Sequence, residues 1–416
     1  MPKYHIWTIG CQMNKAESER LASYFEQLGY QPASADEADL IVLNSCVVRQ
    51  SAEERVVNKL HNLRPLKKLH PDLTIAVTGC LVNSEVSRLQ KSFPHVDYFF
   101  KAGDYPQWLE KPAWEQILPR HPAPSSYVSI IQGCDNFCAY CIVPYRRGRN
   151  RSRALKEIVA EVRELVKRGS KEITLLGQNV DSYGHDLPEQ PDLADLLQEL
   201  NTIDGLLRLR FLTSYPRDMS PRLIQAVASL EKVCEQVSLP VQSGSNEILE
   251  AMRRGYTIEQ YRQLVTEIKS KIAEVALSTD VIVGFPSETA EQFQETLGLL
   301  AELRFDSVHV AAYSPRPGTI AARELEDNVP AGEKKRRLGE VERLQEAVAT
   351  EINGRLLGET VEVLVEGKKK GKWYGRSRSG KIVFFSNPGN CLGKLMVISI
   401  EKTSPWSLQG KVRREE

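Results

Sequence analysis

An alternation of strand-like and helix-like segments runs through most of this 416-residue chain and constrains its fold more than any other feature. Short apolar runs are separated by stretches whose apolar residues recur at helical spacing, as in residues 16–28. Such alternation is typical of parallel sheets covered by helices. A Pro-rich stretch at 118–124 interrupts the alternation, which then restarts, and this predicts a domain boundary.

Three cysteines follow the apolar runs at 4–9, 40–43 and 73–77, and they are Cys11, Cys46 and Cys80. The carboxyl ends of parallel strands share one sheet edge, where ligands of open α/β sheets bind. We therefore expect the three thiols to converge although they are far apart in sequence. The alternative is three unrelated packing residues, because free cysteine is commonly buried.

Six further strand candidates follow the Pro-rich stretch, at 127–131, 172–176, 207–212, 237–241, 276–283 and 307–312. Six β/α units favour an open, incomplete barrel over the full eight-fold one. Short strand-like runs after a charged helix at 332–353 predict a small OB-like barrel. The predicted fold class is α/β, with a parallel α/β domain at 1–118, a partial (β/α)6 barrel at 120–350 and an OB-like all-β domain at 353–416.

Composition is that of a globular protein, with 41% hydrophobic and 26% charged residues. No apolar run approaches the length of a membrane span, and the N-terminus has no signal-peptide pattern, so we expect a cytoplasmic protein without a membrane partner. The net charge of +1 conceals a basic tail, because residues 355–416 hold thirteen Lys and Arg against six Glu. Such a tail suits a polyanion, although a solvated surface would have the same composition.

A dense cysteine motif follows the strand candidate at 127–131 and consists of Cys134, Cys138 and Cys141. Three thiolates on one loop can hold three corners of a 4Fe–4S cubane and leave the fourth iron open. A tetrahedral zinc site would need a further Cys or His nearby, and none is close in sequence. Cytosolic thiols stay reduced, which favours metal ligation over disulfides. We interpret Cys234 and Cys391 as packing residues.

This loop, placed after the first strand of a β/α barrel, resembles the radical S-adenosylmethionine (SAM) superfamily. There the open iron chelates SAM, and reduction cleaves SAM to a 5′-deoxyadenosyl radical. The resemblance implies further SAM contacts after later strands. They are Gln178 and Asn179 at the amino group, Gln242 and Ser243 at the ribose or carboxylate, and Asp280 and Phe285 along the adenine. Each of these segments alone could be an ordinary turn.

The order of the three parts resembles the methylthiotransferase family over essentially the whole chain. The resemblance implies that Cys11, Cys46 and Cys80 hold a second, auxiliary 4Fe–4S cluster, and that the tail is a TRAM RNA-binding domain. It further implies an external reductant such as flavodoxin or ferredoxin, and a sulfur donor. One SAM would methylate sulfur at the auxiliary cluster, and the radical made from a second SAM would activate carbon 2 of an adenine.

Segments 10–14, 44–49 and 141–145 look most like the branch of the family that converts N6-prenylated adenosine beside the tRNA anticodon to its 2-methylthio derivative. Other branches act on threonylcarbamoyl-adenosine or on a ribosomal protein, and the Gln12-Met13 pair weighs against them. Asp181 stands where this resemblance leads us to expect Asn. A non-enzymatic alternative is an iron–sulfur electron carrier or an RNA-binding scaffold, but a carrier normally surrounds each cluster with four thiolates.

Two basic segments are candidate RNA contacts. Arg146, Arg147 and Arg149 lie just after the cysteine loop, and their forks suit the phosphates of a tRNA anticodon stem-loop, with a solvated loop as the alternative. The tail adds basic and aromatic residues that suit phosphate contact and base stacking, namely Lys368, Lys369, Lys370, Lys372, Trp373, Arg376 and Arg378. Trp373 could equally pack inside the small barrel.

Overall fold

The computed structural model describes residues 1–48, 50–82, 86–104, 108 and 118–413. Parts of three sequence predictions lie outside the described residues: Arg49 of segment 44–49, the stretch 109–117 of the first predicted domain, and residues 414–416 of the tail. In the described part of the chain, no helix is both long enough and apolar enough to cross a membrane.

The N-terminal part is a five-stranded parallel sheet in the order β2-β1-β3-β4-β5. The central strand β3 (Leu40–Ser45) is buried along its whole length because both sides are covered by helices. Leu40 and Val42 pack with residues of α1 (Gln12–Gln27), and Ile41 and Leu43 pack with residues of α2 (Gln50–Leu69). The remaining elements are β1 (Lys3–Thr8), β2 (Gln31–Pro32), β4 (Thr74–Gly79), α3 (Val86–Ser92) and β5 (Tyr98–Phe99).

The middle part confirms the partial (β/α)6 barrel. Strands β6 (Ser125–Ser129), β9 (Glu172–Leu176) and β10 (Arg208–Phe211) form one parallel sheet, and β11 (Gln236–Ser238), β12 (Ala276–Val283) and β13 (Ser307–Ala312) form another. A parallel bridge between Leu209 and Val233 joins the two. The outer helices are α5 (Leu155–Lys167), α6 (Leu193–Asn201), α7 (Pro221–Ser229), α8 (Asn246–Ala251), α9 (Ile258–Lys271) and α10 (Ala290–Leu303).

The C-terminal part confirms the small all-β barrel. After α11 (Ile320–Glu324), the long helix α12 (Ala331–Gly354) leads into a closed barrel in the order β14-β15-β16-β18-β17. Its strands are β14 (Thr360–Lys369), β15 (Lys372–Ser377), β16 (Ile382–Ser386), β17 (Leu395–Thr403) and β18 (Leu408–Val412). Val363, Phe385 and Ile398 form its core together with Trp373.

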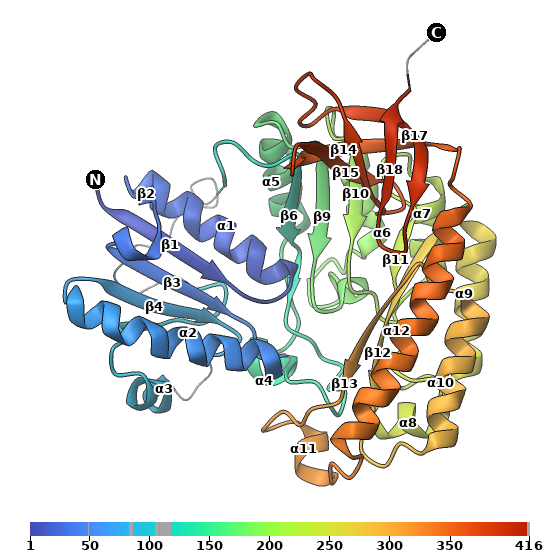
Figure 1. Ribbon diagram of the computed structural model, residues 1–416, viewed down its shortest axis with the longest axis horizontal. Helices are drawn as coiled ribbons and strands as arrows, with labels where there is room; N and C mark the ends of the chain where they lie inside the picture. The colour runs from blue at the N-terminus through green and yellow to red at the C-terminus, as the bar shows by residue number, and fades with distance from the viewer. Residues whose placement is uncertain (49, 83–85, 105–107, 109–117, 414–416) are drawn as a thin grey trace.

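The small barrel docks against the end of the core where strands β6, β9 and β10 begin (Figure 1). Arg208 on β10 is 0% exposed and donates hydrogen bonds to the Arg376 carbonyl oxygen at 2.6 Å and to the Glu362 carboxylate at 2.8 Å. Arg210 pairs with the Glu172 carboxylate at 2.9 Å and donates to backbone oxygens of the small barrel. These buried guanidinium groups fix the small barrel to the core.

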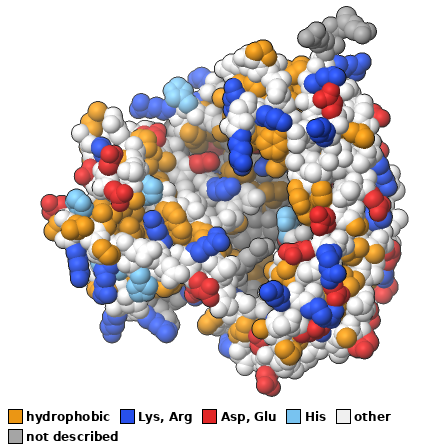
Figure 2. All heavy atoms as spheres, viewed as in Figure 1, with side chains coloured by type: hydrophobic (Ala, Val, Ile, Leu, Met, Phe, Trp, Pro, Cys, Tyr) orange, Lys and Arg blue, Asp and Glu red, His pale blue; other side chains and the backbone are white. Residues whose placement is uncertain are grey.

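The N-terminal part covers the side of the barrel next to β6. Met13 and Ala16 of α1 pack against Leu176 at the end of β9. Arg316, after β13, pairs with Glu53 of α2 at 2.7 Å. The molecular surface is hollowed between the N-terminal part and the core, and Lys and Arg side chains lie at the edges of the hollow (Figure 2).

Candidate active site

A short antiparallel pairing closes the cysteine loop at its neck. Strands β7 (Ile131–Gln132) and β8 (Arg151–Ser152) pair on either side of residues 133–150. Gly133 has a φ of +85°, and a Cβ built on it would lie 2.0 Å from the Arg149 carbonyl oxygen. The neck therefore requires glycine. The side-chain oxygen of Gln178, a predicted SAM contact, accepts a hydrogen bond from the Gly133 N–H at 2.7 Å and so holds the loop.

The thiols of Cys134, Cys138 and Cys141 lie within electrostatic reach of one another. Burial raises the pKa of Cys141 to about 12, and negative charge on Cys138 and Cys134 adds to the effect. Burial also raises the pKa of Cys134, again with a contribution from Cys138. Because iron binds the thiolate form, loading a cluster here must displace protons.

Arg254, which the sequence did not single out, contacts this triad. Its guanidinium Nη1 donates to the Cys138 sulfur at 3.3 Å, and the group stacks over the Tyr215 ring at 4.5 Å. Its other donors reach the Tyr256 hydroxyl and the Pro240 carbonyl oxygen. In the part of the chain that the structure describes, no carboxylate pairs with it. A buried positive charge thus lies directly beside a predicted cluster ligand.

The structure brings Cys11, Cys46 and Cys80 to one sheet edge. Cys11 precedes α1, and the other two follow β3 and β4. A Cβ on Gly10 would lie 2.7 Å from the Cβ of Cys46, so this approach is possible only for glycine. Burial raises the pKa of Cys46 to about 11, and charge on Cys80 and Cys11 adds to the effect.

A buried amide network holds the loops that carry Cys11 and Cys46. Asn14 Nδ2 donates to Asn44 Oδ1 at 2.8 Å and to the Ser45 carbonyl oxygen at 3.1 Å. Asn44 Nδ2 donates in return to the Asn14 carbonyl oxygen at 2.8 Å. Both asparagines belong to the segments that carried the family resemblance, but the sequence alone assigned them no role.

Helix α4 (Val143–Arg147), which follows Cys141, joins the two triads. Ile142 packs in the same apolar cluster as Cys80. Arg147 Nε donates to the Cys80 sulfur at 3.3 Å, and its Nη1 pairs with Glu17 at 2.6 Å. The Arg147 side chain is only 2% exposed. The prediction that Arg147 contacts RNA phosphate is therefore wrong, because its fork is buried and already engaged.

Two of the predicted SAM contacts have buried amide oxygens to which the described structure gives no donor: Oδ1 of Asn179 and Oε1 of Gln242. Buried acceptors without donors are rare because they cost free energy, and the amino or hydroxyl groups of SAM would satisfy them. Gln242 also has a φ of +75°, a strained backbone value of the kind that gathers at functional sites. These two residues fit SAM.

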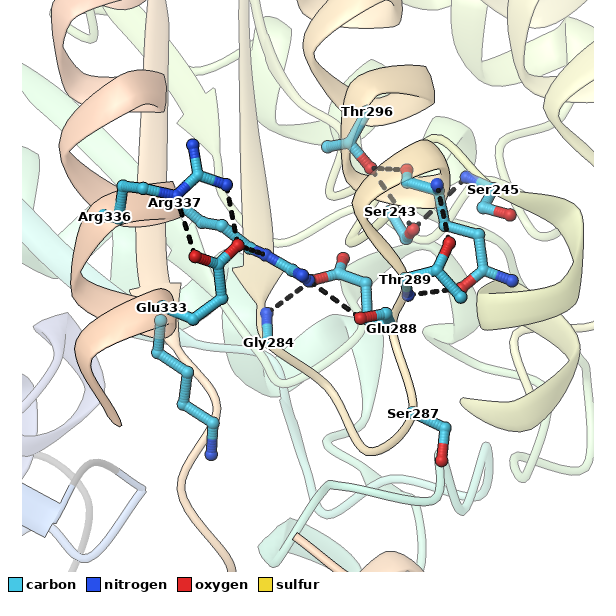
Figure 3. Close-up of polar contacts among 12 residues, drawn as sticks. Ser243, Ser245, Gly284, Ser287, Glu288, Thr289, Thr296, Glu333, Arg336 and Arg337 are labelled. Carbon is cyan, nitrogen blue, oxygen red and sulfur yellow. Dashed lines mark hydrogen bonds and ion pairs between the residues drawn. The ribbon is translucent and has the colours of Figure 1, made fainter. Parts of the chain in front are cut away.

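Two other predicted contacts are corrected by the packing. Ser243 is fully buried, and its hydroxyl accepts the Ser245 N–H at 3.2 Å and lies 3.4 Å from the Thr296 hydroxyl (Figure 3). Phe285 is also fully buried and packs edge-on against Tyr313. Neither side chain has surface to offer a ligand, so Ser243 shapes the turn and Phe285 supports the loop.

An ion pair just after β12 fixes the segment that contains Asp280. Asp280 supplies its carbonyl oxygen to the Gln242 N–H at 2.8 Å, which ties the two predicted SAM segments together. Farther along, the Glu288 carboxylate accepts the Gly284 N–H at 2.6 Å and pairs with Arg337 of α12 at 2.7 Å (Figure 3). The end of β12 is thereby fixed to the helix that leads to the small barrel.

The other predicted RNA contacts differ in exposure. Arg149 is 70% exposed and pairs with Asp135, and Arg146 is half-buried. Lys368, Lys369, Lys370 and Lys372 are exposed around the turn between β14 and β15. Trp373 packs inside the barrel and donates to the Asn387 carbonyl oxygen at 3.1 Å, which excludes base stacking. Arg376 is half-buried, and Arg378 pairs with Glu235 at 2.7 Å, so Arg378 serves the docking interface instead.

Among the described residues, no three His, Cys, Asp or Glu side chains group tightly enough to hold a single metal ion. A cubane makes a different demand, because each of its thiolates binds a different iron and the ligands are correspondingly far apart. The soft, all-thiol donor set of each triad fits iron–sulfur chemistry.

Comparisons with known proteins agree with this architecture. Residues 3–101 match "Uncharacterized protein family UPF0004", residues 128–300 match the Radical SAM superfamily, and residues 354–412 match the TRAM domain. The fold resembles that of the radical SAM methyltransferase TsrM from Kitasatospora setae, with a TM-score of 0.55 at 13% identity over 77% of this chain and 75% of that one.

The fold and the cysteine loop thus define a radical SAM enzyme, with SAM and 4Fe–4S as its cofactors. A relative from Dehalococcoides mccartyi is 56% identical over 99% of both chains, and one from a Roseiflexus species is 51% identical over 100% of this chain and 90% of its own. Both are named tRNA-2-methylthio-N(6)-dimethylallyladenosine synthase. The chain belongs to this family.

Proposed function

We propose that the enzyme converts N6-prenylated adenosine beside the tRNA anticodon to its 2-methylthio derivative. The observation that carries the proposal is the juxtaposition of two three-cysteine sites across α4, each with one buried arginine on a sulfur. An electron carrier or a scaffold requires neither two sites with three thiols each nor SAM-binding residues. We propose domain bounds of 1–118 for the N-terminal domain, 120–350 for the radical SAM core and 353–416 for the RNA-binding domain.

Cys134, Cys138 and Cys141 would hold the cluster that binds SAM, and Cys11, Cys46 and Cys80 would hold an auxiliary cluster, making two 4Fe–4S clusters in all. When bound, the first cluster supplies the electron that cleaves SAM, and the auxiliary cluster supplies the sulfur. Asn179 and Gln242 would orient SAM through their unpaired amide oxygens, and Asp280 would lie along the adenine. Gln178 fixes the loop. A reductant such as flavodoxin or ferredoxin and a sulfur donor complete the partners.

The tRNA would contact two basic groups. Beside the cysteine loop, Arg149 is exposed and Arg146 is half-buried. On the small barrel, the lysines at 368–372 are exposed and Arg376 is half-buried. Exposed cations of this kind suit phosphate contact, and sequence-specific RNA recognition favours loops with splayed bases. An anticodon stem-loop offers a helical backbone together with an accessible adenine.

The substrate test compares prenylated with unprenylated tRNA, each incubated with SAM and a strong reductant, followed by mass analysis of the digested nucleosides. Burial of a five-carbon prenyl group is worth about 0.8 kcal/mol per methylene-sized unit, so we expect turnover on the prenylated RNA and little on the unprenylated RNA. Equal turnover on both, or reaction only with threonylcarbamoyl-adenosine or a ribosomal protein, would contradict the substrate.

The cluster assignment is tested with two triple variants. Cys134→Ala, Cys138→Ala and Cys141→Ala together should abolish SAM cleavage and leave about half of the iron. Cys11→Ala, Cys46→Ala and Cys80→Ala together should leave SAM cleavage intact and stop sulfur insertion. Zinc in place of iron in anaerobically purified protein would reject both assignments.

A further inference from the structure

Arg147 lies between the two cysteine sites although it belongs to the core. It ends α4, only six residues after Cys141, yet its contacts are with the N-terminal part. Its Nε donates to the Cys80 sulfur at 3.3 Å, and its two terminal nitrogens reach the two Glu17 oxygens at 2.6 and 3.4 Å. One guanidinium thus bridges a predicted cluster ligand and helix α1.

The bridge is sheltered from water, which strengthens its electrostatics. The side chains of Arg147 and Glu17 are 2% and 16% exposed. A guanidinium is not deprotonated in proteins, so Arg147 carries its full positive charge, and the Glu17 carboxylate balances that charge at 2.6 Å. Charges in such a site are screened little by salt or solvent.

We propose that Arg147 is a positioning residue for the auxiliary cluster: it donates to the sulfur of Cys80 and, balanced by Glu17, sets the reduction potential of that cluster. This inference rests on the proposed function, because it assumes that Cys80 is a cluster ligand. It adds an assignment within that function, namely which residue outside the cysteines controls the second cluster.

Arg147 and Glu17 act on the reduction potential of the auxiliary cluster in opposite directions. Reduction adds one electron to the cluster, so a nearby positive charge and a hydrogen bond to a ligand sulfur favour the reduced form and raise the potential. The negative charge of Glu17 opposes reduction. Its ion pair with Arg147 also offsets part of the positive charge that acts on the cluster. Removing Arg147 should therefore lower the potential, and removing the charge of Glu17 should raise it.

The test is a redox titration followed by electron paramagnetic resonance. The background protein carries Cys134→Ala, Cys138→Ala and Cys141→Ala, so that only the auxiliary cluster is present and its signal is unmixed. In that background Arg147→Met should shift the midpoint to a more negative value, and Glu17→Gln should shift it to a more positive one. Arg147→Lys keeps the charge but loses the fork, so its shift should be smaller than that of Arg147→Met.

Arg149→Met is the matched control. It removes the same charge two residues further along the chain, but the Arg149 side chain is 70% exposed. It should leave the midpoint where it is. Shifts of the same sign for Arg147→Met and Glu17→Gln, or no shift in either, would overturn the inference while leaving the proposed function standing. If Arg147→Met fails to load iron, Glu17→Gln decides alone: a more positive midpoint potential supports the inference, and a more negative or unchanged one contradicts it. If the background protein binds no iron, the assignment of an auxiliary cluster to Cys11, Cys46 and Cys80 is itself wrong.

Discussion

Asp181 shows how one residue makes this chain differ from the pattern expected of its family. It is buried, and it accepts the Ser214 hydroxyl at 2.9 Å and the Tyr215 N–H at 3.0 Å. Burial outweighs these hydrogen bonds and raises its pKa to about 7 from an ordinary 3.8. Between those values the folded chain binds a proton that the unfolded chain releases. Stability therefore falls as pH rises from about 4 to about 7, and the penalty is complete above that range.

Asp181→Asn should remove this pH dependence. An amide oxygen can accept from Tyr215 while the NH2 group donates to the Ser214 hydroxyl, which can reverse its role. We expect the variant to be more stable than the parent at pH 8, by up to about 4 kcal/mol, with little gain near pH 4. Urea unfolding at both pH values measures the difference. Asp204→Asn, at an exposed position, is the control, and an equal effect of both substitutions would contradict the burial argument.

The basic side chains show what a sequence leaves undetermined. Arg147 and Arg149 are two residues apart in one arginine-rich run, yet one is 2% and the other 70% exposed. Composition predicts only that a segment is basic. Which arginine is buried depends on a carboxylate, Glu17, that lies 130 residues away in sequence. Arg254 was missed for the same reason, because its sulfur partner is 116 residues distant.

Among the elements, those with clear periodicity were predicted best. The bounds predicted for β9, β12 and β13 are those observed. β9 is buried along its whole length, and β12 alternates buried and partly buried residues along most of its length, which are two patterns typical of strands. The OB-like barrel was expected to have five strands, but the positions of β15 and β18 were not predicted. Each contains a glycine against which a neighbouring backbone oxygen packs: a Cβ on Gly375 would lie 2.0 Å from the Leu364 carbonyl oxygen, and one on Gly410 would lie 2.1 Å from that of Ser399. Glycine at a close approach looks like a turn in sequence.

The convergence of Cys11, Cys46 and Cys80 was predictable from the elements, because parallel topology sends strand ends to one edge. The triad at Cys134, Cys138 and Cys141 was predictable from its spacing on one loop. The Asn14–Asn44 network beside Cys11 and Cys46 was not predictable, since side-chain hydrogen bonds between loops arise only once the strands pair.

The neck of the cysteine loop has no room for a side chain at Gly133. Gly133→Ala should displace the loop and reduce iron loading at Cys134, Cys138 and Cys141, because its Cβ would overlap the Arg149 carbonyl oxygen. Gly148→Ala is a matched control: its φ of +81° is similarly positive, but no atom lies within 4 Å of the added Cβ. Because its ψ of −164° also favours glycine, the control should cost about 1–3 kcal/mol of stability without displacing a neighbouring atom. Iron content and SAM cleavage measure the outcome, and equal losses in both variants would refute the steric explanation.

For the whole molecule, the basic tail is not a detachable appendage. Its barrel covers Arg208 and Arg210, which are buried at the start of β10. Deleting residues 355–416 should therefore lower the Tm of the remaining chain, by about 1–2 °C for each kcal/mol that the interface contributes. Differential scanning calorimetry of the two proteins provides the test. An unchanged Tm would mean that the docked interface contributes nothing to stability.

A variant that keeps the small barrel docked on the core separates RNA binding from stability. Replacing Lys368, Lys369, Lys370 and Lys372 with Gln alters exposed side chains, of which Lys368 lies over the Trp373 ring and Lys372 bonds Gln409. Surface contacts of this kind contribute little, so Tm should change much less than on deletion of the tail. If these lysines bind phosphates, affinity for tRNA should fall, and its salt dependence should weaken by about 0.7–0.9 log units per log salt for each phosphate that is no longer neutralised. Filter binding at several salt concentrations measures both, and an unaltered slope would assign the lysines to solubility.

The docking of the small barrel has a geometric consequence for the substrate. The barrel lies where the core strands begin, whereas the cysteine loop and the predicted SAM segments follow their carboxyl ends (Figure 1). A five-residue strand such as β9 already spans about 17 Å. If the exposed lysines bind RNA as proposed, an RNA that contacts both the lysines and the cysteine loop must be at least that long. We then expect the enzyme to measure its substrate: a hairpin can contact both places, whereas a free nucleoside or a short fragment can contact only one of them.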